Sequence, residues 1–326
     1  MIVMQPVSVS AQGSKTRPNS DPRLDWGEAP AGDFSTITTI EIRNDTAIPR
    51  YGELAYSSIP IAKKSDLRTT DGLAVISADN RRMAAQFLVL SRWESGPDDL
   101  RKPMRWLQIT MKANVPANAT VRYELRKYAS LPAVSNAFDL RIIKTNGVYR
   151  LSTGTGTFNL NPANPSLIES IQHGNRLVYK HSPEAGLHVS DSQGAQLTPQ
   201  GDADSFLIEE SGPVRAVLRL RGHFARRMVS CGQDLGYTAR LSFERASTNV
   251  GIEFQIVNEC GNGLKAGGRL ADGTPWWNKT YRINRISWDF PLSTSSTSRI
   301  FASGGGRTFV VPASAESEIS VEQQSG

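Results

Sequence analysis

Cysteine, histidine and long apolar runs are all scarce in this sequence of 326 residues. It has two cysteines and four histidines, and no apolar run approaches the ~20 residues that a membrane-spanning helix needs. This scarcity argues against a disulfide-rich framework, a zinc cluster and a membrane span. A search for a P-loop, a Gly-x-Ser-x-Gly nucleophile motif, a dinucleotide fingerprint after a strand and an HExxH metal motif finds none of them. We therefore expect no cofactor and no metal.

Concentrated positive charge is also lacking. The chain has 37 basic and 31 acidic residues, a formal net charge of +6, and the basic residues are spread along it. A nucleic-acid-binding protein usually carries a basic patch within a known motif, so we expect no nucleic-acid partner. An acidic polymer remains compatible with this charge.

The sequence also lacks amphipathic helices of three or more turns. Instead, apolar and polar residues alternate along much of the chain. The stretch from Ser205 to Phe224 shows it best. One face of the predicted strand is apolar: Val214, Ala216, Leu218 and Leu220. The other face is mostly basic: Arg215, Val217, Arg219, Arg221 and His223. A period of two over this length predicts a strand with one buried face.

The arginines of that strand have two interpretations. Guanidinium groups match the carboxylates of an acidic sugar. They also form cross-strand ion pairs, and the hairpin that follows offers Glu244, Glu253 and Glu259. We favour the ion-pair ladder, because such ladders are ordinary on the wet face of an antiparallel sheet.

Short alternating segments separated by turn residues continue through the chain. We expect order to begin near Phe34, after a flexible segment over residues 1–30. Residues 81–93 fit either a helix or a strand. Thr36, Thr38, Ile40 and Ile42 are expected to share one face of a strand, and Ile286, Trp288 and Phe290 are expected to alternate inward. The rhythm predicts an all-β protein built as a sandwich or barrel, with a linker near residues 128–136.

The two cysteines flank a predicted hairpin of residues 236–245 and 250–258. This pairing would bring Cys231 and Cys260 close together, as a disulfide or as two free thiols. A disulfide would indicate an exported protein. The apolar N-terminus ending near Ala11 fits either the tail of a secretory signal or a disordered segment. A secreted or cell-surface location is our expectation.

Adjacent tryptophans mark the candidate ligand site. Trp276 and Trp277 lie in a glycine-rich stretch, residues 261–282, with polar neighbours Lys279, Tyr281 and Arg282. Aromatic faces stack on sugar rings, and loops often carry function. The competing interpretation is that one tryptophan closes the edge of the sandwich. Since neighbouring side chains of a strand point to opposite faces, both cannot point inward.

Several segments together resemble the exo-rhamnogalacturonan lyase-like family. LIEESGPVRAVLRLRGHF and YTARLSFERASTNVGIEFQIVN resemble its central β-sandwich, and TGTGTFNLN fits the start of that domain. PRYGELAYSSIPIAKKSDL, QFLVLSRW and MRWLQITMKANVPANATVRYELRKY resemble the RIFT-type barrel that precedes it. The resemblance runs from about Phe34 onward and rests on ordered pattern, with no catalytic motif.

After the flexible segment at 1–30, the resemblance implies a RIFT-type β-barrel at 31–130 and an antiparallel β-sandwich at 131–326. It further implies a lyase that cleaves an acidic pectic polysaccharide by β-elimination, with a C-terminal α/α toroid as partner domain that this sequence does not show. We expect the chain to be a fragment, inactive alone, and we assign no catalytic residue. The alternatives are a non-catalytic carbohydrate-binding protein that uses Trp276 and Trp277, and a structural β-protein.

Overall fold

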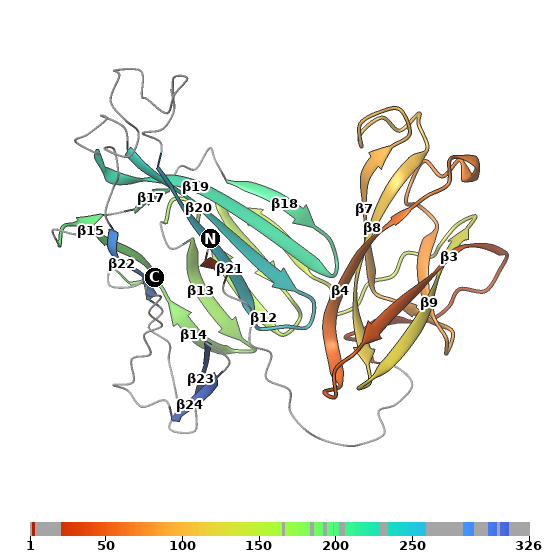
Figure 1. Ribbon diagram of the computed structural model, residues 1–326, viewed down its shortest axis with the longest axis horizontal. Coiled ribbons are helices and arrows are strands. Elements are labelled where there is room, and N and C mark those ends of the chain that lie inside the picture. Colours follow the sequence, from red (N-terminus) through yellow and green to blue (C-terminus); the bar gives the residue numbers. More distant parts are fainter. Residues whose placement is uncertain are drawn as a thin grey trace.

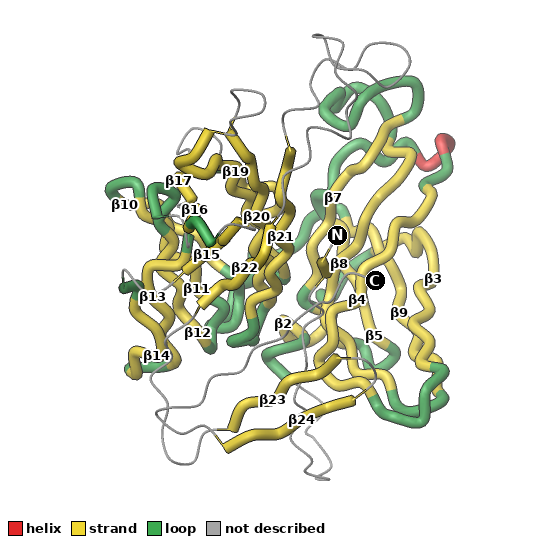
Figure 2. The backbone as a smooth tube through the Cα atoms, turned by 60° about the vertical axis from the view of Figure 1, so that its left-hand side comes forward, coloured by secondary structure: helices red, strands yellow, loops and turns green. Residues whose placement is uncertain are grey.

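A computed structural model gives the architecture (Figure 1). It describes residues 2–3, 21–164, 167–182, 186–191, 194–197, 199–201, 206–227, 234–258, 283–289, 299–304 and 307–312. Within this described part the fold is all-β, as predicted: the one helical segment is a 3-10 turn, η1 (Lys63–Ser65), marked red in Figure 2. In the described part of the chain, no helix is long and apolar enough to cross a bilayer.

The first β-body contains two sheets that share a core. Its strands are β2 (Asp25–Glu28), β3 (Phe34–Asn44), β4 (Arg50–Pro60), β5 (Leu73–Ser77), β6 (Arg81–Met83), β7 (Ala85–Arg92), β8 (Met104–Val115) and β9 (Ala119–Tyr128). One sheet has the order β2-β6-β5-β9-β3 and the other β4-β8-β7. Residues 81–93, left open by their pattern, are thus strands. A RIFT-type topology for this body stays a prediction.

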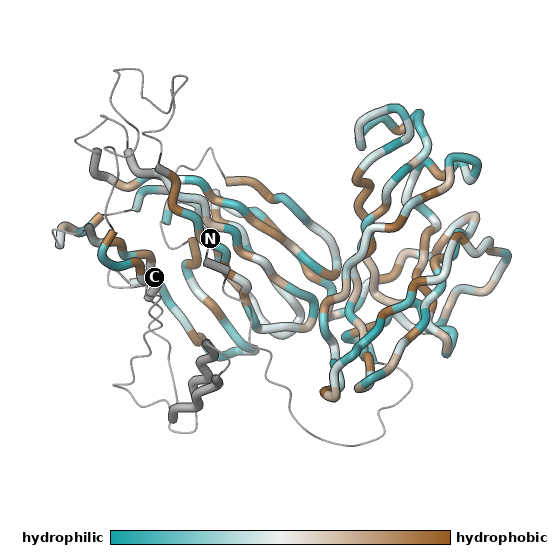
Figure 3. Tube along the Cα trace, viewed as in Figure 1, coloured by the Kyte–Doolittle hydropathy of each residue, from teal (hydrophilic) through white to brown (hydrophobic). Residues whose placement is uncertain are grey.

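Alternation in β8 shows how sequence builds this core. Leu107, Ile109, Met111 and Ala113 are all buried, while the intervening side chains face the other way. Figure 3 shows the same interleaving of apolar and polar residues along the strands of both bodies. Burying one face of each strand releases water from apolar surface, at roughly 25 cal/mol per Å². This term holds the two sheets together.

Strand β3 departs from the expected alternation. Its pairing with β9 shifts between Thr36 and Thr38, so one residue is inserted there. Ile37 therefore packs against the core together with Ile40 and Ile42, and Thr36 is exposed. The expectation that Thr36 shares a face with Ile40 is wrong, because a bulge changes the face of every residue before it.

Order begins earlier than expected. The chain is regular from Asp21, β2 pairs with β6, and Leu24 is buried in the first core. The expectation of order from Phe34 is therefore wrong for residues 21–33. Ile2 and Val3 form a short strand, β1 (Ile2–Val3), which pairs with a strand of the second body.

The second β-body is a sandwich of two main sheets. One has five strands in chain order: β10 (Arg141–Thr145), β11 (Val148–Ser152), β12 (Gly156–Leu160), β13 (Ile168–His173) and β14 (Arg176–Lys180). The other has the order β1-β21-β20-β19-β17, with β18 also paired to β19: β17 (Pro199–Gly201), β18 (Leu207–Ser211), β19 (Arg215–Arg227), β20 (Asp234–Glu244) and β21 (Val250–Asn258). Phe158 and Phe243 meet between the sheets, with ring centroids 4.9 Å apart.

The strand that begins after the turn at residues 211–213 is β19, and it buries the face that its alternation predicts. Val214, Ala216, Leu218 and Leu220 are fully buried in the second core. The hairpin of β20 and β21 is also confirmed, with Phe243 opposite Val250 at its closed end.

The remaining described strands lie at the margins of this body. β22 (Ile283–Asp289) pairs with β15 (Gly186–Asp191), which also pairs with β16 (Gln196–Leu197). Ile286 is exposed, so the expectation that it faces inward is wrong, whereas Ile283 packs against the core. β23 (Arg299–Gly304) and β24 (Arg307–Pro312) pair with each other. Phe290 lies outside the described residues.

Candidate functional site

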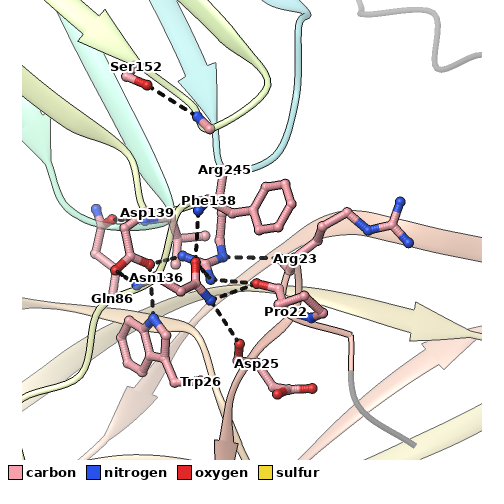
Figure 4. Close-up of polar contacts among 12 residues, drawn as sticks. Pro22, Arg23, Asp25, Trp26, Gln86, Asn136, Phe138, Asp139, Ser152 and Arg245 are labelled. Carbon is pink, nitrogen blue, oxygen red and sulfur yellow. Dashed lines mark hydrogen bonds and ion pairs between the residues drawn. The ribbon is translucent and has the colours of Figure 1, made fainter. Parts of the chain in front are cut away.

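The two β-bodies meet at a buried polar junction centred on Arg245, the residue directly after β20 (Figure 4). Three segments converge there: residues 21–26, residues 136–139 and the turn between β20 and β21. Arg245 has no exposed surface. Its position continues the inward alternation of Leu241 and Phe243, so the strand geometry drives a charged group toward the interior.

The guanidinium of Arg245 is satisfied by four acceptors. Nε donates to the carbonyl of Arg23 at 3.0 Å, and Nη2 donates to the carbonyl of Pro22 at 2.8 Å. Nη2 also donates to Oδ1 of Asn136 at 2.8 Å, and Nη1 pairs with the Asp139 carboxylate. Burial lowers the pKa of Arg245 to about 10, and the negative charge of Asp25 opposes that shift. The junction therefore stabilises a charge that its surroundings would otherwise exclude.

The acceptors are themselves held in place. Asp139 Oδ1 accepts a hydrogen bond from Trp26 Nε1 at 2.9 Å, and its Oδ2 accepts one from the Asn136 backbone at 2.9 Å. The Asn136 amide donates to the carbonyl of Pro22 at 2.8 Å. Trp26 belongs to the first body and Asp139 opens the second. This carboxylate therefore joins both bodies and the segment between them.

The segment before residue 136 is anchored as well. Arg82, from β6, donates through Nη1 to the carbonyl of Pro132 at 3.0 Å, and its guanidinium lies 5.3 Å from the ring centroid of Trp26. Burial lowers the pKa of Arg82. The predicted linker near residues 128–136 begins at the last residue of β9 and has no regular secondary structure from residue 129 on, yet its Pro132 carbonyl has a defined partner in the first body.

A second contact joins the bodies through Gln86 of β7. Its Oε1 accepts hydrogen bonds from the backbone N–H of Val214 at 3.3 Å and Arg215 at 3.1 Å, and its Nε2 donates to Glu210 at 2.8 Å. A Cβ on Gly212 would lie 2.1 Å from Gln86 Oε1. Only a glycine therefore leaves room for this side chain in the turn between β18 and β19.

Charged pairs surround the Gln86 contact. Arg215 pairs with Glu210 at 3.0 Å, and Lys112 of the first body pairs with Glu244 of the second at 3.3 Å. Burial raises the pKa of Glu210, and the nearby charge of Arg215 opposes the rise. Carboxylates at the junction are thus committed to structural partners.

The arginine ladder on β19 exists, with partners that differ in part from those expected. Glu209 of β18 pairs with Arg219 at 3.0 Å and with Arg240 at 2.8 Å. Arg240 also meets Glu253 at 3.5 Å. Glu244 pairs across the junction with Lys112, and Glu259 lies outside the described residues. The ion-pair interpretation therefore holds for Arg215 and Arg219.

The predicted sugar site cannot be placed, since Trp276, Trp277, Lys279, Tyr281 and Arg282 lie outside the described residues, as do Cys231 and Cys260. Among the histidines, His173 and His223 are exposed and His181 and His188 are half-buried. In the part of the chain that is described, no three Asp, Glu, His or Cys side chains gather in a way that could hold a metal ion.

A pocket of about 300 Å³ lies where β3 ends and β4 begins. The Asn44 amide in its wall donates to the carbonyls of Ile48 at 2.8 Å and Pro116 at 3.0 Å. Arg50 and Glu53 pair with each other at 3.2 Å. These polar groups already have partners within the fold, so the pocket offers little to a ligand.

Sequence reasoning missed the Arg245 junction. The signal that could have revealed it is an arginine in register with Leu241 and Phe243 on an otherwise apolar face. A charge at such a position needs a buried acidic partner, and Asp139 is that partner. The pairing joins residues 106 apart in sequence, which a local pattern does not report.

Comparison with known proteins identifies the second body. A family model described as the PcRGLX-like protein central beta sandwich domain matches residues 140–263. No curated protein matches. Among solved structures, a protein in glycosyl hydrolase family 38 from Enterococcus faecalis is similar at a TM-score of 0.49 and 10% identity, over 84% of this chain and 35% of that one.

The matched stretch begins at Leu140, directly after the junction carboxylate Asp139, and contains the strands β10 to β21. A domain of this kind indicates a carbohydrate-active protein. Residues 140–263 are thus a PcRGLX-like central β-sandwich, which relates this chain to the exo-rhamnogalacturonan lyase-like family.

Proposed function

We propose that this chain supplies the β-built part of an exo-rhamnogalacturonan lyase-type protein that acts on acidic pectic polysaccharide. The match of residues 140–263 carries the proposal. The two β-bodies act as one rigid frame, held by Arg245 and Gln86, beside the α/α toroid that the family resemblance implies. The chain acts outside the cell or at its surface.

The chemistry proposed for the complete protein is β-elimination. A base removes the proton next to the uronate carboxylate, a cation stabilises the charge that develops, and the bond to the 4-oxygen of the uronate breaks. The base and the cation are not assigned here. In the described residues, Asp139, Glu210 and Glu244 are engaged in ion pairs that hold the fold. We therefore assign this chain a framing and binding role.

Substrate contact within this role is proposed for the tryptophan pair and its neighbours. Trp276 and Trp277 would stack on sugar rings, and Lys279 and Arg282 would meet uronate carboxylates. Tyr281 would add a hydrogen-bonding group. Such a set suits a polymer that alternates apolar ring faces with negative charge.

Two measurements test this function. A protein that combines this chain with the proposed toroid should release unsaturated uronate from rhamnogalacturonan, detected by its ultraviolet absorbance. It should leave a neutral glucan intact. The chain of 326 residues should bind the same polymer in affinity electrophoresis, and Trp276→Ala with Trp277→Ala should weaken that binding. Absence of any product from the longer protein would refute the lyase assignment.

A non-catalytic carbohydrate-binding role is the second candidate. The ion-paired state of the junction carboxylates favours it, because those groups are not poised to exchange protons. It predicts polymer binding without product formation in either protein. The two candidates therefore separate on the product assay alone.

A further inference from the structure

The outer face of the sheet β4-β8-β7 gathers four large apolar side chains that are exposed to solvent. They are Tyr56 at 66%, Leu88 at 44%, Leu90 at 40% and Trp106 at 39% exposure. Scattered exposed apolar residues are ordinary, but a contiguous group marks an interaction site. Figure 1 shows this sheet on the side of the first body that faces the hairpin of β18 and β19.

Strand register places these side chains on one face. In β4, Ala55 and Ile59 pack against the core, so Tyr56 and Ser58 point outward. In β8, Leu107 and Ile109 are buried, so the side chains of Trp106 and Gln108 share the outer face. Pairing of the three strands then defines three outer rows: Tyr56, Thr110 and Gln86; Ser58, Gln108 and Leu88; and Pro60 with Trp106.

The two rings stand apart with polar groups between them. Tyr56 lies opposite Thr110, four positions along β8 from Trp106, which corresponds to about 13 Å at 3.3 Å per residue. Ser58 and Gln108 are directly paired in the row between the rings. A hydroxyl and an amide can each donate and accept hydrogen bonds, as sugar hydroxyl groups require.

The electrostatics of this face suit an acidic chain. The outer rows from Tyr56 to Trp106 contain no carboxylate. At the end next to the second body, Gln86, Thr110 and Lys112 are buried. Here the Arg215 guanidinium lies 5.9 Å from the centroid of the Tyr56 ring. Arg215 and Lys112 are paired with Glu210 and Glu244 of the second body, so a uronate at this end meets compensated charge, with no carboxylate in the rows of the sheet itself.

We propose that this face is a second glycan-binding surface, on which Tyr56 and Trp106 stack against sugar rings of one acidic oligosaccharide and Ser58 and Gln108 bind the hydroxyl groups between them. The inference rests on the proposed function and adds a site to it. A protein partner fits the face less well, because two of the three residues in its central row are polar and none of them is charged. Leu88 and Leu90 border the bound oligosaccharide and exclude water from it.

Titration calorimetry of the full chain with oligosaccharides of rhamnogalacturonan tests the proposal. Tyr56→Ala and Trp106→Ala should each reduce the affinity by about tenfold or more, as for other aromatic anchors. Tyr56→Phe keeps the ring and should retain binding. Tyr51→Ala removes another well-exposed aromatic residue from the same strand, outside this face, and should leave affinity unchanged.

Unchanged affinity of the Tyr56→Ala/Trp106→Ala double variant would overturn this site while leaving the proposed function standing, since the wild-type chain would still bind. Wild-type chain that binds no oligosaccharide would overturn both. Self-association of the wild type that is lost in the double variant, without a change in glycan affinity, would identify a protein contact and overturn the proposal. Circular dichroism confirms that each variant is folded.

Discussion

Arg245 shows how a single side chain can decide the arrangement of a whole molecule. Its position directly after β20 commits it to the interior, and the first body supplies two carbonyls that accept its hydrogen bonds, those of Pro22 and Arg23. A lysine would keep the charge but would lose the planar fork that reaches several acceptors at once. The arrangement of the two bodies is therefore coupled to the chemistry of one guanidinium.

Replacing Arg245 with methionine should be strongly destabilising. The change leaves the Asp139 carboxylate buried without its cation, which costs about 3–5 kcal/mol for a buried pair. Urea denaturation followed by fluorescence measures the loss. The double variant Arg245→Met/Asp139→Asn should lose less than the sum of the single variants, because no unpaired charge remains.

Arg43→Met provides the matched control. Arg43 pairs with Asp45, but both side chains are largely exposed. Exposed pairs contribute about 0–1 kcal/mol. Equal losses of unfolding free energy in Arg43→Met and Arg245→Met would show that burial does not set the strength of the Arg245 contact.

Glu210 should give the protein a pH dependence of its own. Burial raises its pKa in the folded state above the ordinary value of 4.5. As the pH rises through 4.5, the unfolded chain loses this proton first, so the folded state binds more protons and the unfolding free energy falls. Glu210→Gln should remove this decline. Denaturation midpoints of the wild type and of Glu210→Gln, measured at pH values above and below the ordinary pKa, test this difference.

Glu94 supplies a comparison of opposite sign. Lys63, at 2.5 Å, lowers the pKa of this exposed carboxyl. Its contribution is present above the ordinary pKa and is lost as the pH falls through the folded value. Glu94→Gln should therefore flatten the acid side of the curve slightly, since solvent screens the pair. A Glu210→Gln curve parallel to wild type would contradict the burial argument.

At the scale of elements, the close approach of neighbouring strands and side chains restricts which residue can occupy position 222 of β19. Gly222 pairs with Gly201 of β17 and with Tyr237 of β20. A Cβ there would lie 2.3 Å from the carbonyl oxygen of Gln200 and 2.5 Å from the Tyr237 hydroxyl. Burial raises the pKa of Tyr237 well above its usual range, and its hydroxyl donates to that carbonyl at 3.2 Å. The glycine thus makes space for a buried hydroxyl and its acceptor.

Gly222→Ala should destabilise the second body by about 1–3 kcal/mol, the usual range for overpacking. Thermal unfolding monitored by circular dichroism measures the change. Gly96→Ala is the control, since nothing lies within 4 Å of its would-be Cβ. It should be neutral or slightly stabilising, because alanine has fewer conformations in the unfolded chain. Similar effects at both positions would argue against a steric origin.

At the scale of the whole molecule, alternation carried most of the information that the sequence could give. It predicts the buried face of β19, the β20–β21 hairpin and the all-β class, because each depends on neighbouring residues. It misplaces Thr36, since an inserted residue is invisible to a period of two.

The contacts at the junction are long-range, so local alternation does not report them. Gln86 is an ordinary polar residue in a stretch whose pattern fits helix or strand, and Asp139 follows the predicted linker at 128–136; only the fold brings them to Val214 and Arg245. Their pairing depends on how two bodies are docked. Composition and periodicity describe each body separately, so the contacts between the bodies could not be predicted from them.

Docking through two independent contacts should make the bodies unfold together. Gln86→Ala leaves the buried N–H of Val214 and that of Arg215 without an acceptor, at a cost of about 1–3 kcal/mol. Combined with Arg245→Met, it removes both contacts while leaving the core of each body intact. We expect the wild-type chain to show one calorimetric transition and the combined variant to show two.

Gln108→Ala is the matched control, because Gln108 lies on the same sheet face and makes only a long hydrogen bond, 3.4 Å, to Thr110. It should retain a single transition at nearly the wild-type temperature. A single transition in the combined variant would mean that the contacts remaining between the bodies, among them the Lys112–Glu244 pair and the Trp26–Asp139 hydrogen bond, are enough to couple them. Adding Lys112→Met to that variant then shows how much of this coupling is ionic, since the Lys112 side chain is buried and pairs with Glu244 across the junction.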